Sequence, residues 1–421
     1  MLRGRLTLTV AAVAALYLSR AGIAAEQDAN WPRFGGPLGD FHTSDTALPT
    51  EWDAGKIVWR TSLGGFGQSS PVIWNDQIFL TTSEQAADGK VARQVMCVNR
   101  KDGKIAWKTE VAVGGGETIH KMNSFATGTC ATDGQRVVAY FGPGGLHCLD
   151  MQGKIQWSLD LVKPTGPFGF GASPIILGDM VIQNCDAEGP SSLIAVNKNT
   201  GETIWRTARK DMPKGGWSTP ILIDAGQRKE LILNGEFGVH GYNPETGEDL
   251  WSCQSFNGRG TPVPAWTHGL LITVNGKPGD LYAVKPGGSG DVTKTHMAWH
   301  TARGGARDLP SPVAAGDFCF VVNMAGVGSM YDVASGKELW RERVGGNFSA
   351  TPLVANGLIY AMDEEGSTLV IRPGAKLDVV AKNRIGDIGD QIFFFLSTPS
   401  QGRLLLRSDS TLYCIGSGEA E

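Results

Sequence analysis

The sequence is poor in charge and lacks the signatures of several classes of protein. Charged residues make up only 19% of the 421 residues, whereas glycine contributes 57. This balance disfavours long solvated helices and disorder and favours a turn-rich β protein. No apolar run after the first residues is long enough to cross a bilayer. The motifs G-x-S-x-G, H-E-x-x-H, G-x-G-x-x-G and the Walker loop are absent, so nothing indicates a serine nucleophile, a metalloprotease or a nucleotide site.

The cysteines also lack the spacing of a disulfide or metal framework. Seven are present, an odd number, and no two form a C-x-x-C or an adjacent pair. Three of them occupy one position of an internal repeat that other copies fill with alanine or glycine: Cys97, Cys148 and Cys414 against Ala195, Gly241 and Ala283. Such a position is a tight buried slot, so we expect these cysteines to pack as small apolar side chains. A disulfide or a metal site is the alternative.

The first 25 residues have the pattern of a cleaved signal peptide. Arg3 and Arg5 precede an apolar stretch of 13 residues, Leu6 to Leu18, which is short for a membrane anchor. Small residues follow, and we expect cleavage after Ala24 or Ala25. The mature chain is therefore predicted to be soluble and periplasmic or extracellular.

The predicted mature chain is negatively charged. Of the 38 basic residues, Arg3, Arg5 and Arg20 lie in the signal segment, which leaves 35 against 42 acidic residues. Such a surface is unsuited to nucleic acid or to an anionic membrane. The first cysteine is Cys97, so no cysteine near the cleavage site is available for a lipid anchor. We expect a monomer with neither a membrane span nor a lipid anchor.

A tryptophan motif recurs along the chain at intervals of 41 to 50 residues. In six copies a Gly-Lys or Gly-Glu pair precedes the tryptophan, and a seventh copy, KTHMAW, is degenerate. The tryptophans are Trp59, Trp107, Trp157, Trp205, Trp251, Trp299 and Trp340. A period of this length indicates a propeller or solenoid, and we expect each tryptophan to dock between neighbouring units.

A second motif, Ser or Thr followed by Pro at the start of an apolar run, gives an independent count. Its prolines are Pro71, Pro174, Pro220, Pro262, Pro312, Pro352 and Pro399. The interval from Pro71 to Pro174 is two periods wide and contains Thr127-Gly-Thr129 where the missing copy is expected. The two motifs are out of phase, and each indicates eight units.

Each unit contains four short apolar segments separated by turns, as at 172–176, 180–184, 192–197 and 203–207. Such a pattern is typical of an antiparallel meander. One sheet alone cannot bury both of its faces, whereas eight sheets stacked around an axis protect one another. The predicted fold class is therefore all-β, an eight-bladed β-propeller of four-stranded antiparallel blades.

The two ends of the repeat are expected to share one blade. Residues 397–416 supply three strands, and residues 55–63 supply an outer strand with no blade before it. An N-terminal strand would thus close the C-terminal blade. The predicted organisation is a signal peptide at 1–25, a lead-in segment at 26–54, the propeller at 55–416 and a tail at 417–421.

The segments 195–205 and 241–251 resemble the tryptophan-docking motif of PQQ-dependent quinoprotein alcohol dehydrogenases. Both keep Asn, Thr, Gly and Trp at one spacing over eleven residues. NWPRFGGP (30–37) and TEW (50–52) resemble the lead-in of exported bacterial PQQ-like repeat proteins, a group that includes the BamB-type outer-membrane assembly factors. This resemblance implies the same propeller, without catalysis as in the BamB type or with PQQ and calcium as in the dehydrogenases.

The sequence departs from the dehydrogenases at features that the resemblance would require. Those enzymes have an adjacent cysteine pair over the cofactor, and this chain has none. A loop containing Asn184, Asp186 and Glu188 offers oxygen ligands of the kind that calcium binds. As a lone turn it is expected to be solvated. No cofactor is firmly implied, and PQQ with calcium is the only candidate.

Loops from each outer strand to the next inner strand are expected to surround the central channel on one face. Side chains from several blades converge there, which makes this face the default site for a ligand or partner. The candidate residues are Gln68, His120, Lys121, Asn123, Trp217, Arg259, Arg303, Arg307, Asp308, Asn347 and Gln391. The arginines would suit an anionic or polar ligand because guanidinium groups bind carboxylates through two hydrogen bonds. Each residue taken singly is also explained as a turn or solvated residue.

The sequence thus predicts a non-catalytic, extracytoplasmic propeller that binds a protein, peptide or polysaccharide, with no catalytic or metal residue assigned. The alternative is a PQQ-dependent alcohol or sugar dehydrogenase with an atypical site. A carbohydrate-active or lyase propeller has less support because no paired carboxylates occur at corresponding loop positions. Phe393, Phe394 and Phe395 are expected to pack between blades, with a partner-binding patch as the alternative.

Overall fold

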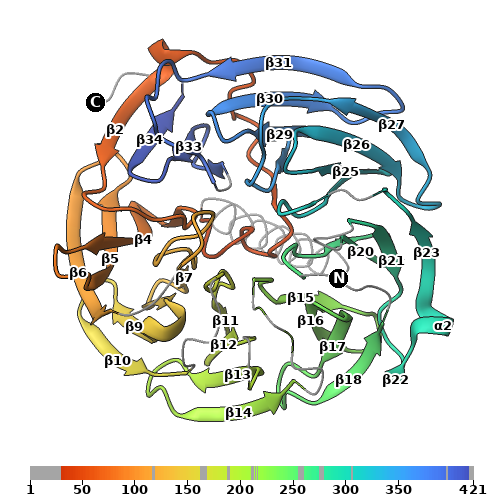
Figure 1. Ribbon diagram of the computed structural model, residues 1–421, viewed down its shortest axis with the longest axis horizontal. Helices are drawn as coiled ribbons and strands as arrows, with labels where there is room; N and C mark the ends of the chain where they lie inside the picture. The colour runs from red at the N-terminus through yellow and green to blue at the C-terminus, as the bar shows by residue number, and fades with distance from the viewer. Residues whose placement is uncertain are drawn as a thin grey trace, which may run out of the picture.

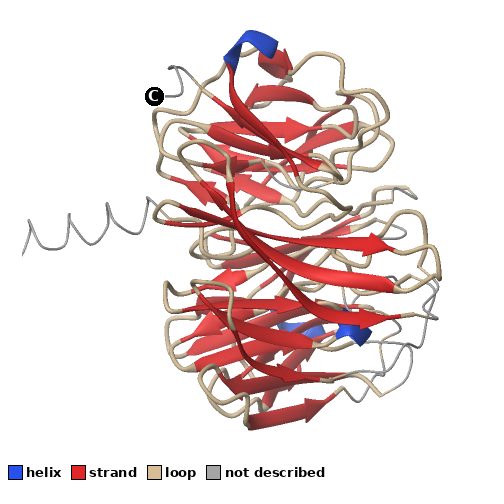
Figure 2. Ribbon diagram, turned by 90° about the vertical axis from the view of Figure 1, so that its left-hand side faces the viewer, coloured by secondary structure: helices blue, strands red, loops and turns tan. Residues whose placement is uncertain are grey.

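Eight antiparallel sheets surround a central axis in the computed structural model (Figure 1). It describes residues 30–115, 119–161, 168–186, 190–209, 213, 215, 217–254, 260–274, 279–304, 307–394 and 397–416. The predicted signal peptide and tail, together with Arg259 and Glu188, lie outside these residues. Nearly all of the described structure is strand and loop (Figure 2). The predicted eight-bladed β-propeller is confirmed.

Blades 1 to 4 follow one another along the chain, and each begins with its innermost strand. Blade 1 contains β3 (Val72–Trp74), β4 (Gln77–Gln85), β5 (Val91–Asn99) and β6 (Ile105–Gly114). Blade 2 contains β7 (Ala131–Thr132), β8 (Arg136–Tyr140), β9 (Leu146–Asp150) and β10 (Ile155–Leu159). Blade 3 contains β11 (Ile175–Leu177), β12 (Met180–Asn184), β13 (Ser192–Asn197) and β14 (Thr203–Ala208). Blade 4 contains β15 (Ile221–Asp224), β16 (Lys229–Gly235), β17 (Gly238–Tyr242) and β18 (Asp249–Cys253), with β22 (Gly290–Asp291) added outside β18.

Blades 5 to 7 repeat this order, and blade 8 is completed by a strand from the start of the chain. Blade 5 contains β19 (Ala265–Thr267), β20 (Leu270–Val274), β21 (Leu281–Val284) and β23 (Met297–Thr301). Blade 6 contains β24 (Val313–Ala315), β25 (Phe318–Val322), β26 (Val327–Asp332) and β27 (Glu338–Arg343). Blade 7 contains β28 (Leu353–Ala355), β29 (Leu358–Met362), β30 (Ser367–Arg372) and β31 (Asp378–Arg384), with β1 (His42–Thr43) inside β28. Blade 8 contains β32 (Thr398–Pro399), β33 (Leu404–Arg407), β34 (Thr411–Ile415) and β2 (Ile57–Ser62).

Helical structure is confined to three short turns in the described residues: η1 (Ala54–Lys56), η2 (Gly142–Gly144) and α2 (Thr293–His296). None of these has the length or the apolar composition that crossing a membrane would require.

Blade 8 is closed by both ends of the chain. β2 pairs antiparallel with β34, and Trp59 lies opposite Cys414. Figure 1 shows the red-orange β2 beside the blue β34. The predicted joining of residues 55–63 to the last three strands is therefore confirmed.

The Ser/Thr-Pro motif links the inner strands of neighbouring blades. The backbone N–H of Ser70 donates to Oγ1 of Thr129 at 2.9 Å, that of Thr129 to Oγ of Ser173 at 3.0 Å, and that of Ser173 to Oγ1 of Thr219 at 3.0 Å. All four residues are buried. The hydroxyls of Thr129, Ser173 and Thr219 thus each satisfy an inner N–H that has no strand partner towards the channel. Thr129 takes the place of the missing copy, as the spacing predicts.

Blade 5 departs from the predicted position of this motif. Its inner strand β19 begins after Pro264, and the N–H of Val263 donates to Oγ of Ser311 at 2.9 Å. The Val263-Pro264 pair therefore corresponds to the Ser/Thr-Pro pairs of the other blades, and the assignment of Pro262 is wrong by two residues. Valine supplies no hydroxyl, and Oγ of Ser218 donates to the carbonyl of Pro262 at 3.2 Å in this joint.

Six of the seven recurring tryptophans dock onto the following blade, as predicted, and Trp251 is the exception. Nε1 of Trp59 donates to the carbonyl of Arg100 at 3.2 Å, and the Trp59 ring lies against Gly103. A Cβ at Gly103 would lie 2.6 Å from that ring, and the residue has a φ of +73°, so only glycine fits there without strain. Oγ1 of Thr61 donates to the carbonyl of Gly103 at 2.6 Å and completes the contact.

The same contacts recur around the ring. Further tryptophan Nε1 atoms donate to the next blade at 2.9 to 3.1 Å in the pairs Trp107–Met151, Trp157–Lys198, Trp299–Val333 and Trp340–Gly374. Further threonines donate to a glycine carbonyl of the next blade in the pairs Thr109–Gly153, Thr207–Gly247 and Thr301–Gly336. Trp205 keeps the ring position against Gly247, but its Nε1 has no hydrogen-bond partner.

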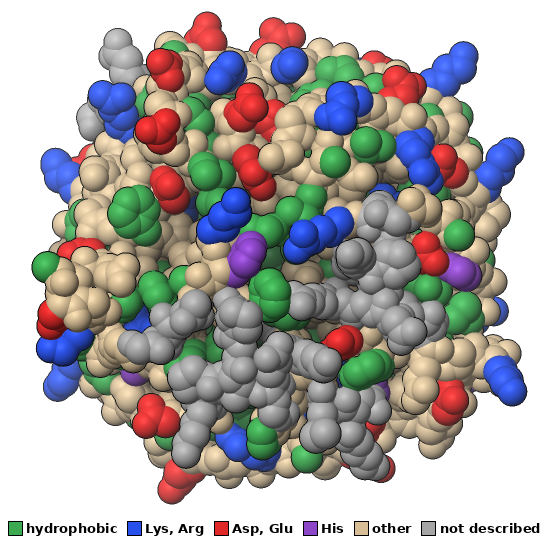
Figure 3. Space-filling view, in the orientation of Figure 1, with side chains coloured by type: hydrophobic (Ala, Val, Ile, Leu, Met, Phe, Trp, Pro, Cys, Tyr) green, Lys and Arg blue, Asp and Glu red, His purple; other side chains and the backbone are tan. Residues whose placement is uncertain are grey.

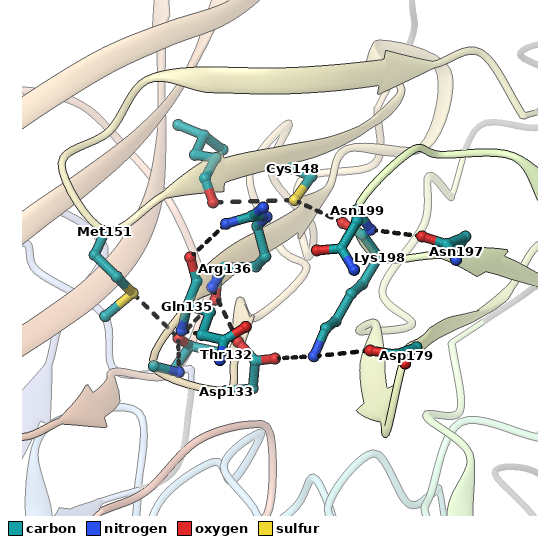
Figure 4. Close-up of polar contacts among 12 residues, drawn as sticks. Thr132, Asp133, Gln135, Arg136, Cys148, Met151, Asp179, Asn197, Lys198 and Asn199 are labelled. Atoms are coloured by element: carbon teal, nitrogen blue, oxygen red, sulfur yellow. Dashed lines mark hydrogen bonds and ion pairs between the residues drawn. The ribbon is translucent and has the colours of Figure 1, made fainter.

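The cysteine slot lies beside this docking contact (Figure 4). Sγ of Cys148 is 3.5 Å from the carbonyl oxygen of Lys198, which also accepts the hydrogen bond from Trp157. Nζ of Lys198 bridges Asp133 at 2.8 Å and Asp179 at 3.3 Å. All seven cysteines are buried and free, and burial raises the pKa of Cys148 to about 12. These contacts agree with the prediction that Cys148 packs in a tight buried slot.

The lead-in segment crosses the channel at the end where each innermost strand turns into the second strand of its blade. Trp31 bridges to Ile73 of blade 1, and the carbonyl of Pro32 accepts a hydrogen bond from Thr132 of blade 2 at 2.8 Å. β1 pairs in parallel with β28 of blade 7. Nε2 of His42 is 2.6 Å from the carbonyl of Ala314 in blade 6. The segment thus contacts inner strands on opposite sides of the ring, and we call it the channel plug (residues 30–48).

Candidate functional site

The loops from each outer strand to the next inner strand lie on the face opposite the channel plug, which we call the loop face. In blades 6, 7 and 8 these loops are held at equivalent positions. The backbone N–H of Met324 donates to the carbonyl of Arg307 at 3.0 Å, and that of Glu364 donates to the carbonyl of Asn347 at 2.8 Å. The N–H of Asp409 donates in the same way to Ile392, next to Gln391, at 3.0 Å. The structure thus places Arg307, Asn347 and Gln391 in corresponding loops of one face.

Asn347 and Gln391 line a cavity of about 300 Å³ on the loop face between blades 6 and 8. Its other lining residues are Glu364, Glu365, Arg384, Ile388, Gly389, Asp390 and Ile392. An adjoining cavity of about 390 Å³ shares Glu365 and Arg384 and is otherwise lined by Gly345, Gly346, Asp363, Ser367, Lys382 and Asn383. We call the two together the acidic groove. Figure 3 shows acidic side chains gathered over the upper part of this face, where blades 7 and 8 lie.

The carboxylates of the acidic groove differ in their surroundings. Asp363 is buried, and its Oδ1 accepts backbone hydrogen bonds from Glu365 at 3.1 Å and Ser367 at 2.8 Å. Burial raises the pKa of Asp363 above its ordinary value. Oε1 of Glu364 accepts a hydrogen bond from Ser349 at 2.5 Å. Among the described residues, no ion pair joins these carboxylates to Lys382 or Arg384, which leaves the exposed Glu365 carboxylate available to a basic group in solution.

An aromatic row follows the loop face over blades 2 to 4. The rings of His120 and Phe168 lie 5.4 Å apart, and those of Phe168 and Trp217 lie 6.5 Å apart, edge to face. The three residues come from three successive loops and are all half-buried. Nδ2 of Asn123 donates to the carbonyl of Phe168 at 2.7 Å and holds two of these loops together. Lys121 is exposed beside His120.

Gln68 and Asn123 are supports within the loops. Oγ1 of Thr127 donates to Oε1 of Gln68 at 3.3 Å and also contacts Oδ1 of Asn123. Gln68 is buried, and its N–H donates to the carbonyl of Ala126 at 2.9 Å. The side chain of Gln391 is held similarly, because its Oε1 accepts from Ser408 at 2.6 Å. The side-chain amides of Gln68, Asn123 and Gln391 therefore fix loop geometry.

Arg303 and Asp308 are buried and bind each other. Nη1 of Arg303 lies 2.6 Å from Oδ2 of Asp308, and its Nε donates to the hydroxyl of Tyr331 at 3.0 Å. Their side chains are 2% and 0% exposed, so neither presents its charge to a ligand. Arg307, in contrast, is exposed. Of the three arginines proposed for an anionic ligand, Arg259 lies outside the described residues, and only Arg307 of the other two faces solvent.

The expectation that the loop at Asn184 and Asp186 is solvated is wrong. Both residues are buried, and Oδ1 of Asp186 lies 3.2 Å from Nε of Arg209. Nδ2 of Asn184 donates to the carbonyl of Ser218 at 3.1 Å. The sequence could not reveal this pairing because Arg209 belongs to the outer end of blade 3, 23 positions away. Within the described residues, no group of three or more His, Cys, Asp or Glu side chains is arranged to hold a metal ion.

Sequence reasoning missed the acidic side of the groove and part of the aromatic row. Glu364 and Glu365 belong to the D-E-E-G turn between β29 and β30, and this run of acids was the available signal. Phe168 follows Gly166 and Pro167 in the sequence, and nothing in that pattern indicated that its ring would lie beside those of His120 and Trp217. Phe393 is buried and packs on Tyr413 at 6.0 Å, which confirms packing for this residue. Phe395 lies outside the described residues.

Comparison with known proteins relates most of the ring to one family. The family model described as outer membrane protein assembly factor BamB matches residues 41–114, 91–264 and 239–375. The chain is 24% identical over 303 residues to the outer membrane protein assembly factor BamB of Burkholderia pseudomallei (strain K96243), covering 68% of each chain. It is also 24% identical over 326 residues to the tetrathionate hydrolase of Acidithiobacillus ferrooxidans, covering 73% of this chain but only 51% of that protein. The crystal structure of BamB from Moraxella catarrhalis has the same fold, with a TM-score of 0.61 at 15% identity over 86% of this chain and 99% of that one.

Proposed function

This chain belongs to the outer membrane protein assembly factor BamB family, and on that premise we propose that it is a non-catalytic binding module for a protein partner. The proposed site is the loop face, and the acidic groove is the observation that carries the proposal. Loops from several blades meet there around two adjoining cavities of about 300 and 390 Å³. The plug occupies the other end of the channel, so a partner approaching along the axis meets the loop face.

The groove and the aromatic row define the chemistry of the partner. Glu364, Glu365 and Asp390 give the groove an acidic character that suits a segment rich in lysine or arginine. The half-buried rings of His120, Phe168 and Trp217 suit apolar side chains, because aromatic residues supply much of the binding energy of protein interfaces. A partner with a basic segment and neighbouring apolar side chains would contact both regions.

The relatives support a role outside the cytoplasm. Two curated relatives are named as outer membrane protein assembly factor BamB and one solved relative as BamB, and we propose that this chain acts in the periplasm or outside the cell. A peptide partner would use the same face, whereas a polysaccharide would use the aromatic row without the carboxylates.

We do not extend the proposal to PQQ-dependent dehydrogenation. The oxygen ligands suggested for calcium include Asp186, whose carboxylate is buried and held by Arg209 at 3.2 Å. The docking tryptophans are occupied in joining blades, for example Trp157 with Lys198. No residue of the described structure is therefore assigned to PQQ or calcium.

Co-purification of the full chain from its native compartment tests the proposal. We expect a defined protein partner whose recovery falls when Glu365→Lys and Asp390→Lys reverse two exposed charges of the groove. The matched control reverses two exposed charges on the far face, Glu245→Lys and Glu248→Lys, and should recover the partner normally. Equal recovery of the partner by both double variants would overturn the proposed site. Tight binding of added PQQ and calcium with dye-linked alcohol oxidation would overturn the non-catalytic assignment.

A further inference from the structure

One joint of the ring departs from the repeat. Between β21 and β23 of blade 5 the chain replaces the usual Gly-containing turn with a longer segment that contains β22 and α2. β22 leaves blade 5 and pairs in parallel with β18 of blade 4, so that Gly290 lies opposite Trp251 and Asp291 opposite Ser252. An exception to a repeat of this regularity marks a place where the sequence is shaped by something other than ring packing.

The inserted segment is held in place by a buried carboxylate. Nε1 of Trp251 donates to Oε2 of Glu230 at 2.8 Å instead of to a carbonyl of the next blade. The side chain of Glu230 is fully buried, and Oε1 accepts from Nε of Arg228 at 2.7 Å. The N–H of Gly287 donates to the same carboxylate at 3.3 Å, and Nη2 of Arg228 donates to the carbonyl of Gly288 at 2.9 Å. Both members of the Arg228–Glu230 ion pair of blade 4 thus form hydrogen bonds to the insertion.

β22 and β18 together border a cavity of about 250 Å³ at the outer rim of the ring. It is lined by Arg209, His240, Tyr242, Asp249, Trp251, Ser252, Gln254, Gly290 and Asp291, and we call it the rim cavity. Arg209, His240 and Tyr242 are each at least nine-tenths buried, whereas Asp249, Gln254 and Asp291 are exposed. The cavity therefore has a buried base and a polar rim, so a small ligand would contact buried side chains below and exposed polar groups at the opening.

The base of the rim cavity is organised by contacts between its side chains. Arg209 pairs with Asp186 at 3.2 Å, donates to the hydroxyl of Tyr242 and lies over that ring at 5.7 Å from its centroid. The imidazole of His240 stacks on Tyr242, with centroids 5.9 Å apart and planes 14° apart. Nδ1 of His240 lies 3.5 Å from Oδ2 of Asp249. These contacts preorganise the base before any ligand binds.

We propose that the rim cavity binds a single neutral sugar residue. Its rim offers the carboxylates of Asp249 and Asp291, the hydroxyl of Ser252 and the amide of Gln254. Two carboxylates make the rim richer in acceptors than in donors, which favours a ligand that carries several hydroxyl donors. The volume is below the roughly 300–1,000 Å³ of sites for drug-sized ligands and matches one small ring.

Charge argues against the other ligand classes. An anion would face Asp249 and Asp291, while the positive charge of Arg209 is already held by Asp186. A cation would be drawn to the rim carboxylates but would meet the buried guanidinium of Arg209 at the base. The described residues include no His, Cys, Asp and Glu group arranged for a metal ion. The site lies on the outer rim and is independent of partner binding at the loop face.

Saturation-transfer NMR of the full chain with glucose, galactose, mannose and N-acetylglucosamine tests this inference. We expect at least one of them to bind saturably and Asp249→Asn or Gln254→Ala to weaken that binding roughly tenfold, equivalent to about 1.4 kcal/mol. The control Asp224→Asn changes an exposed carboxylate of the same blade outside the cavity and should leave binding unchanged. Thermal unfolding of each variant verifies that it is folded, and Gln254→Ala alters an exposed side chain whose loss leaves the strands intact.

Three results would overturn the inference. The first is an absence of saturable binding by all four sugars at concentrations about tenfold above 1 mM. The second is binding that neither cavity variant weakens. The third is competition showing that putrescine or inorganic phosphate, included as cation and anion probes, occupies the cavity in preference to the sugars.

Discussion

Trp59, near the start of the chain, lies directly opposite Cys414 in the ladder that β2 forms with β34. The two residues are 355 positions apart, so this ladder closes the ring over nearly the whole length of the sequence. The Trp59 ring also packs on Gly103 of blade 1. A single residue therefore joins the last blade to the first.

Removing β34 should open the ring. Deletion of residues 411–421 takes away the strand between β33 and β2, and we expect loss of the cooperative unfolding transition with exposure of apolar surface. Deletion of residues 417–421 alone leaves this ladder complete and should leave the transition unchanged. Circular dichroism and dye binding during heating measure both. Normal cooperative unfolding of the longer deletion would show that the closing strand is dispensable.

The docking tryptophans should differ in what their Nε1 atoms contribute. Trp157→Phe removes a hydrogen bond to Lys198, whereas Trp205→Phe removes a buried donor that has no partner. Both changes delete the same atoms, so we expect Trp157→Phe to lower the free energy of unfolding by about 1–2 kcal/mol more than Trp205→Phe does. Denaturant titration of both variants measures this difference. A larger loss for Trp205→Phe would contradict the argument.

Substitution of the two arginines in the loop from blade 5 to blade 6 should change stability by very different amounts. Arg303→Met leaves Asp308 as a buried, unpaired charge and should cost about 3–5 kcal/mol of stability. Arg307→Met changes an exposed residue and should alter stability by less than about 0.5 kcal/mol. The double variant Arg303→Met/Asp308→Leu removes both charges and should recover much of the loss. Equal unfolding midpoints for the two single variants would show that the buried pair has no structural role.

Asp363 should give stability a dependence on pH. Burial raises the pKa of its carboxyl in the folded protein, so the folded state binds the proton more tightly than the unfolded chain does. Its favourable contribution is complete below the ordinary carboxyl pKa and is lost as the pH rises through the raised value. Asp363→Asn cannot ionise and keeps an oxygen for the N–H groups of Glu365 and Ser367.

We therefore expect the stability of Asp363→Asn relative to the parent chain to increase as the pH rises from about 4 to about 7. Unfolding midpoints of the two proteins over this range measure the effect. Parallel pH profiles would mean that Asp363 titrates identically in the folded and unfolded states.

The repeat could be recognised in the sequence because the motifs that build each blade lie close together in the chain. Trp157, Gly201 and the threonines two residues after several tryptophans act at positions that recur from blade to blade. One motif misled the assignment: Pro262 resembles the Ser/Thr-Pro copies, yet β19 begins after Pro264. A sequence offers no way to choose between two nearby prolines when the hydroxyl that marks the others is replaced by Val263.

The sequence by itself determined the number of blades, the docking of tryptophan between blades and the closure of blade 8 by both ends, because each follows from motifs that recur about every 50 residues. Only the tertiary structure decided which charged residues are available. Arg303 forms an ion pair with Asp308, and Asp186 forms one with Arg209. Glu365, in contrast, is exposed beside Asn347 and Gln391. Burial and pairing depend on neighbours that the ring brings together from separate blades, and the composition of a loop does not contain that information.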